Sequence, residues 1–126
     1  MLDNLLNLLG RAALALVFIP AGFSKIGAYE ATAGYMDSVG VPGALLPLVI
    51  LLEIAGGLAV LLGILTRPAA LSLAAFSVVA AVTFHADFGD QVQSIMFAKN
   101  IGLAGGFLVL ASQAPAAWSV DAIRRR

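Results

Sequence analysis

Four long stretches of the chain carry almost no charge, and their lengths constrain the fold more than any other feature. Thirteen residues without Asp, Glu, Lys or Arg separate Arg11 from Lys25, and uncharged runs also cover residues 68–86 and 100–120. Residues 38–66 form a further apolar run, in which Glu53 is the only Asp, Glu, Lys or Arg. About 20 apolar residues cross the hydrocarbon core of a bilayer as a helix. The sequence therefore predicts four transmembrane helices, over about residues 5–24, 44–65, 68–86 and 95–112.

The composition agrees with a membrane protein and excludes several other classes. The 126 residues are 61% hydrophobic and 11% charged, with a mean hydropathy of +1.01. A soluble domain of this size cannot hide so much apolar surface, which argues against a soluble enzyme and against disorder. Seven basic and seven acidic residues leave no basic excess for nucleic acid. Because the chain has no cysteine and one histidine, we expect no metal site, no covalent cofactor and no self-contained redox centre.

The distribution of charge between the connections predicts the orientation. Arg67 lies in the turn between the second and third spans, and residues 124–126 are all arginine. The other two connections hold Glu30, Asp37, Asp87 and Asp90. By the positive-inside rule, both termini are predicted to be cytoplasmic in an up-down bundle of four helices.

The first connection is not plain coil. Tyr29, Ala33, Met36 and Val39 recur at helical spacing, and Gly40 follows them. This pattern predicts a short amphipathic helix over about residues 28–39, lying at the outer membrane interface, either as a structural strap or as a lid. We expect one membrane domain over residues 1–126.

Polar residues inside the spans are the candidates for function. A charge in hydrocarbon costs at least about 2.5–3.5 kcal/mol, so it normally faces the bundle and finds a partner. Small residues four apart allow membrane helices to pack closely. Ala98, Gly102 and Gly106 have this spacing, and Lys99 lies beside them, so Lys99 is expected to face a neighbouring helix. We therefore expect an intramembrane polar cluster, which either binds a ligand or only fixes the register of the helices. Its members are Arg11, Lys25, Glu53, His85, Lys99 and Asn100.

Glu53 falls near the middle of its span and needs a polar partner there. Residue depths, at about 1.5 Å per residue, bring Lys99, Asn100 or Arg11 within its reach. If the cluster binds a ligand, we expect a cavity bounded by Glu53, His85 and Lys99 on the outer side. Aromatic side chains such as those of Tyr29, Phe84 or Phe88 would line it. If the cluster is only structural, these side chains should pack against each other without a void.

The order of several short motifs resembles the DoxX family of small bacterial membrane proteins. The motifs are Gly10-Arg11, Phe18, Gly22, Lys25, Gly40-Val41-Pro42, Leu52-Glu53-x-x-Gly56-Gly57, Gly63, Arg67, Phe84-His85, Lys99-Asn100, Gly105-Gly106 and Trp118-Ser119-x-Asp121. The resemblance implies a four-helix bundle in the bacterial inner membrane, related to the membrane subunit of a thiosulfate:quinone oxidoreductase. Some members are linked to redox complexes that handle thiols or superoxide, but the family supplies no agreed catalytic residue.

Three functions follow as hypotheses. The first is a subunit of a quinone-linked or thiol/sulfur redox system, which binds a quinone or another small ligand at the polar cluster. The second is a non-catalytic anchor or assembly subunit of a larger membrane complex or homo-oligomer. The third is a small-anion or proton conduit that uses Arg11, Lys25 and Lys99 along one path, and it is the weakest because so short a chain offers no inverted repeat. The sequence leaves open whether the protein is itself an enzyme.

Overall fold

The computed structural model describes residues 1–124, and two of the arginines that predicted the orientation, at 125 and 126, lie outside this part. Within it, the protein is all-helical and holds four helices that are long and apolar enough to span a membrane, which confirms the expected fold class. The elements are α1 (Leu2–Gly27), α2 (Tyr29–Ser38), the 3-10 turn η1 (Gly43–Leu45), α3 (Leu46–Leu62), α4 (Thr66–Phe84), α5 (Gln91–Ser112) and α6 (Val120–Arg124).

Local capping explains where the helices depart from the expected bounds. α5 begins at Gln91 rather than near residue 95 because the Asp90 side chain accepts hydrogen bonds from the backbone of Val92 at 2.9 Å and of Gln93 at 3.4 Å. α3 ends at Leu62 rather than near residue 65 because Gly63 adopts a left-handed conformation with φ of 72°. The short helix α6 was not expected from the sequence.

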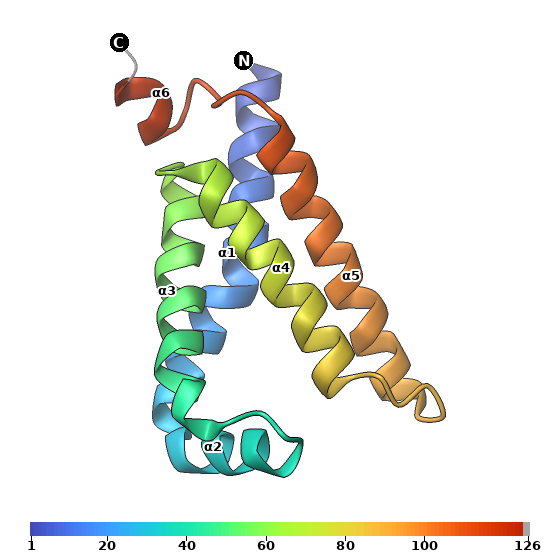
Figure 1. The fold of residues 1–126 in the computed structure, drawn as a ribbon. Coiled ribbons are helices and arrows are strands. Elements are labelled where there is room, and N and C mark those ends of the chain that lie inside the picture. The colour runs from blue at the N-terminus through green and yellow to red at the C-terminus, as the bar shows by residue number, and fades with distance from the viewer. Residues whose placement is uncertain (125–126) are drawn as a thin grey trace.

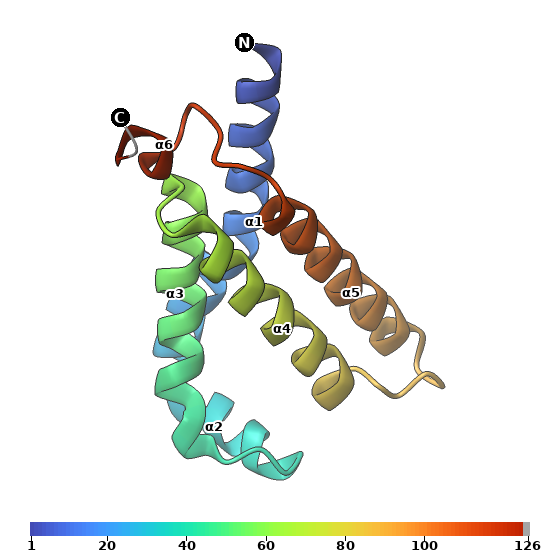
Figure 2. The same ribbon diagram turned by 45° about the horizontal axis from the view of Figure 1, so that its top comes forward.

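The four long helices form two packed pairs. α1 runs along α3, and α4 runs along α5 (Figure 1). The pairs meet where α3 turns into α4, and they diverge toward α2, as both views show (Figure 2). We call the end that holds the start of α1, the α3–α4 turn and α6 the α6 end, and the opposite end the α2 end. This divergence positions the candidate site at the α2 end.

Glycines make the seam between α1 and α3 tight. A Cβ atom on Gly22 would lie 2.5 Å from Ile54 Cγ1, and one on Gly57 would lie 2.7 Å from Ile19 Cγ1. The two backbones therefore approach more closely than larger residues allow. The ladder expected on α5 does not form such a seam, because no atom of another described element lies within 4 Å of a Cβ on Gly102.

Buried side chains from all four long helices join the two pairs. Phe18 of α1, Val60 of α3, Leu73 of α4 and Phe107 of α5 belong to a single apolar cluster. The rings of Phe18 and Phe107 lie 5.5 Å apart, and Phe18 also meets Phe76 edge-on at 6.2 Å. This cluster holds the two pairs together on the α6 side of the opening between them.

Candidate ligand site at the α2 end

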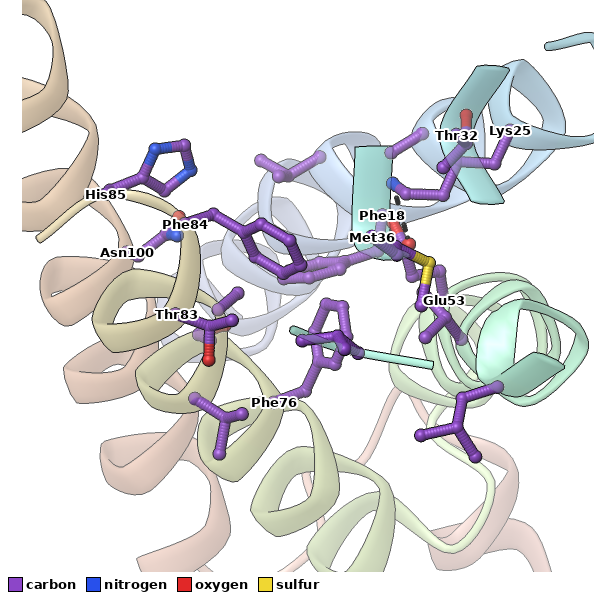
Figure 3. Close-up of a pocket in the computed structure, with 18 of the residues that line it drawn as sticks. Phe18, Lys25, Thr32, Met36, Glu53, Phe76, Thr83, Phe84, His85 and Asn100 are labelled. Atoms are coloured by element: carbon purple, nitrogen blue, oxygen red, sulfur yellow. Dashed lines mark ion pairs between the residues drawn. The ribbon is translucent and has the colours of Figure 1, made fainter. Parts of the chain in front are cut away.

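A cavity of about 450 Å³ fills the opening between the two helix pairs at the α2 end. α1, α3, α4 and α5 supply its walls, and α2 with η1 lies over it. Most of its lining is aliphatic or aromatic, including Phe18, Phe76 and Phe84 (Figure 3). Both its size and its mixture of apolar walls with a few polar groups are typical of small-molecule sites.

An ion pair between α1 and α3 forms one wall of the cavity. Lys25 Nζ lies 2.8 Å from Glu53 Oε1, and Figure 3 shows the two side chains pointing toward each other. The Glu53 residue is 1% exposed, whereas the Lys25 side chain is 30% exposed. Apart from this ammonium group, no donor in residues 1–124 hydrogen-bonds Glu53 Oε1. The expectation that Lys99, Asn100 or Arg11 pairs with Glu53 is therefore wrong, because the packing of α1 on α3 brings Lys25 there first.

Two further polar groups lie on the facing wall, which α4 and α5 build. His85 and Asn100 both line the cavity across from Glu53 (Figure 3). His85 Nδ1 lies 2.7 Å from Gln93 Oε1, which can only accept a hydrogen bond. With the Gln93 amide oriented in this way, the contact fits the tautomer that carries the proton on Nδ1, and Nε2 faces no hydrogen-bond partner within residues 1–124. The Asn100 side chain lines the cavity, so its amide can reach a ligand there.

The short helix α2 covers the cavity. Met36, 4% exposed, and Tyr35 both line the cavity on the side of α2. The ring of Tyr35 stacks on Phe84 of α4 at 5.6 Å with an interplanar angle of 25°, so this contact bridges the gap between the helix pairs. Of the aromatic residues expected here, Phe84 lines the cavity, but Tyr29 and Phe88 do not.

Arg11 belongs to a different place, near the α6 end. It is 2% exposed and donates to Asn7 Oδ1 at 2.8 Å, to the Leu61 carbonyl at 3.0 Å and to the Val60 carbonyl at 3.4 Å. It also donates to the carbonyl of Trp118. Carbonyls at the end of a helix lack the regular intrahelical donors; here the Gly63 N–H donates to the Val60 carbonyl at 3.3 Å, and Arg11 adds donors to Val60 and Leu61. The negative end of the helix dipole also stabilises a buried cation at this place. Arg11 thus has a structural role.

Asp121 joins α6 to the same end of the bundle. Its carboxylate accepts hydrogen bonds from the backbone of Leu65 at 2.8 Å, the backbone of Thr66 at 2.9 Å and the Thr66 hydroxyl at 2.8 Å. Burial alone would raise the pKa of Asp121, but these hydrogen bonds and the nearby Arg124 together lower that pKa below its ordinary value. The α6 segment therefore caps the start of α4.

Lys99 lies outside the cavity, contrary to the expectation from the sequence. Its residue is exposed on α5, and it forms no ion pair within residues 1–124. α5 packs on α4 and barely meets α1, so the face with Lys99 and Gly102 stays on the outside of the bundle. Arg11, Lys25 and Lys99 consequently lie in three separate places rather than along one path.

Several residues of the site went unnoticed in the sequence. Gln93, which orients His85, is the third residue of α5 and has no distinctive spacing. Ser77, Thr83 and Tyr35 also line the cavity. Ser77 shares a helical face with His85, so this spacing was the one available signal for it.

Comparisons with known proteins identify the family of the chain. The DoxX profile matches residues 6–86. The chain is 48% identical over 120 residues to the inner membrane protein YqjF of Escherichia coli K12, covering 95% of this chain and 92% of that protein. It is 37% identical over 123 residues to the inner membrane protein YphA of the same organism, covering 92% and 88%. No solved structure matches. The chain belongs to the DoxX family.

Proposed function

We propose that the protein binds a quinone in the cavity at the α2 end and serves as the membrane subunit of a redox system. The observation that carries this proposal is the void itself. A polar cluster that only fixed helix register would pack its side chains together, whereas Lys25 and Glu53 stand across about 450 Å³ of open space from His85 and Asn100.

The lining suits a quinone headgroup. A quinone ring is flat and apolar with a carbonyl oxygen at each side, and the aromatic walls offer Phe18, Phe76 and Phe84 to such a ring. The Lys25 ammonium and the Asn100 amide are donors for its oxygens, one on each wall. When bound, a quinone supplies transfer of two electrons and two protons.

The chain's own residues would handle the protons. His85 would take up a proton at Nε2, since Nδ1 is held by Gln93, and pass it to the reduced quinone. Glu53 is the other group on the cavity wall that could take up a proton and pass it on, and Lys25 compensates its charge at 2.8 Å. Because the chain has no cysteine, we place the exchange of electrons with a partner subunit, which carries the thiol or sulfur chemistry.

A binding measurement tests this function. Purified protein in mild detergent is titrated with a short-tailed ubiquinone, and the affinity is compared between wild type and Asn100→Leu. We expect the variant to bind roughly 2- to 10-fold more weakly, because it loses one hydrogen bond to the ring. Lys99→Leu is the matched control, since it alters the neighbouring residue of α5 without touching the cavity.

Equal binding by wild type and Asn100→Leu, or no binding by either, would contradict the quinone role. The anchor or assembly role would then replace it.

The orientation in the inner membrane is also part of the proposal. We place the α6 end in the cytoplasm because Arg67 and Arg124 lie there, and α2 and the Asp90 turn on the outer face. Reporter fusions after Arg124 and at Asp90 are expected to report opposite compartments, with the Arg124 fusion cytoplasmic. The same compartment for both fusions would refute this topology.

A further inference from the structure

Two adjoining hollows lie at the α6 end, away from the candidate quinone cavity. One is a pocket of about 310 Å³ beside the start of α4, and the other is a groove of about 870 Å³ between α1 and α5. Asn7, Arg11, Leu110 and Gln113 line both, so the pocket opens into the groove. The groove exists because α1 packs on α3 and α5 packs on α4, which leaves α1 and α5 apart.

We infer that a phospholipid binds in these hollows, with its phosphate at Arg67 in the pocket and an acyl chain in the groove between α1 and α5. This site is independent of the quinone proposal, because the two lie at opposite ends of the bundle.

The pocket offers donors that the protein leaves free. Arg67 is exposed and donates through Nε to the Ala111 carbonyl at 2.8 Å, while its two terminal nitrogens have no hydrogen bond within residues 1–124. Asn7 Oδ1 accepts from Arg11, so the NH2 group of Asn7 is left unengaged. Free guanidinium and amide N–H groups suit a phosphate diester.

The charge of the pocket also favours a phosphate. Arg11 lines it, and all four hydrogen-bond acceptors of this cation are uncharged oxygens. Asp121 is the carboxylate of the pocket; it attracts Arg11 through space and already accepts three hydrogen bonds from Leu65 and Thr66. A second carboxylate, Asp3, lines the groove but not the pocket. In the described part of the chain, Lys25 and Glu53 form the sole ion pair, so Arg67 is not neutralised by a carboxylate.

The groove is apolar at its deeper end. Leu14, Val109 and Leu110 line it there, and two glycines leave its floor without side chains. No atom of another described element lies within 4 Å of a Cβ built on Gly10, and a Cβ on Gly106 would meet Leu14 at 3.4 Å. A hydrocarbon chain fits such a surface better than water does.

The level of the pocket in the membrane agrees with this occupant. Trp118, 42% exposed, lies at the same end, and its backbone carbonyl accepts from Arg11. Exposed tryptophan side chains gather at the membrane interface, where lipid phosphates also lie. The polar end of the hollow therefore meets the headgroup layer, and the groove runs from it into the hydrocarbon.

Native mass spectrometry of the delipidated full-length protein in mild detergent tests the site, with three probes. Phosphatidylglycerol has both parts of the ligand, diacylglycerol with the same chains lacks the phosphate, and inorganic phosphate lacks the chains. We expect tight binding of phosphatidylglycerol alone, weakened about tenfold by Arg67→Gln and about fivefold by Gly10→Leu, which fills the groove. Matched controls are Arg124→Gln and Gly102→Leu, which make the same changes outside both hollows and should shift the affinity by less than about twofold.

Each other outcome would overturn the inference. If Arg67→Gln and Arg124→Gln lower the affinity for phosphatidylglycerol equally, the lipid is attracted to basic residues in general and does not bind at a site. Inorganic phosphate that displaces the lipid at millimolar concentration would mean a phosphate pocket without a role for the groove. A wild-type dimer that Gly10→Leu dissociates would mean that a second copy of the chain occupies the groove.

Discussion

Replacing Lys25 with methionine is expected to lower the free energy of unfolding by roughly 3 kcal/mol, because it leaves a buried carboxylate without its counter-ion. Glu53 is 1% exposed, and the Lys25 ammonium at 2.8 Å is the one charged group paired with it in residues 1–124. Unfolding by SDS in mixed detergent micelles measures the change. The double variant Lys25→Met/Glu53→Leu should recover most of the loss, since an apolar pair often replaces a buried ion pair at little cost.

Lys99→Met is the matched control for this experiment. It removes the same ammonium group from an exposed position with no ion pair, so the free energy of unfolding should change by less than about 0.5 kcal/mol. If Lys25→Met and Lys99→Met unfold alike, the Lys25–Glu53 contact does not stabilise the bundle. If the double variant is as unstable as Lys25→Met, the loss comes from packing rather than from an uncompensated charge.

Replacing Arg11 with leucine is expected to cost at least about 3 kcal/mol, because several carbonyl groups lose their donor at once. The guanidinium of Arg11 serves the Val60 and Leu61 carbonyls at the end of α3 and the Trp118 carbonyl in the segment before α6. Leucine fills only part of the space of this buried side chain and removes every one of these bonds, so the loss includes a cavity term. The same unfolding experiment in mixed micelles measures the effect.

Arg67→Leu is the control for the second prediction. Arg67 is exposed and donates to a single carbonyl, that of Ala111, so its loss should cost no more than about 1 kcal/mol. An Arg11→Leu variant as stable as Arg67→Leu would show that the α6 end does not depend on the Arg11 contacts. Arg11→Lys should fall between the two, because an ammonium group cannot reach all of these carbonyls at once.

Arg11 and the cavity residues illustrate two different kinds of intramembrane polar residue. Arg11 is nearly inaccessible, and its hydrogen bonds are all made within the chain. Lys25, His85 and Asn100 instead border open space and keep donors or acceptors free. The cost of placing a polar side chain in hydrocarbon predicts that such residues face the bundle interior. This cost does not distinguish residues that stabilise the fold from residues that can bind a ligand.

The sequence by itself determined the four membrane helices, because apolar runs of about 20 residues with at most a few charges are long enough to span a bilayer. It also determined that α2 would be a separate short helix and that Glu53 must find a polar partner. These conclusions depend only on the composition and periodicity of single segments, so no knowledge of helix pairing was needed.

Only the tertiary structure decided which partner Glu53 takes and which polar residues share a cavity. Residue counts give depth in the membrane, but they do not give the rotation of a helix or the identity of its neighbour. α1 packs on α3 through Gly22 and Gly57, which brings Lys25 to Glu53, whereas the pairing of α5 with α4 turns Lys99 outward and Asn100 inward. Adjacent residues of a helix point about 100° apart, so this one rotation separates a cavity residue from an exposed one.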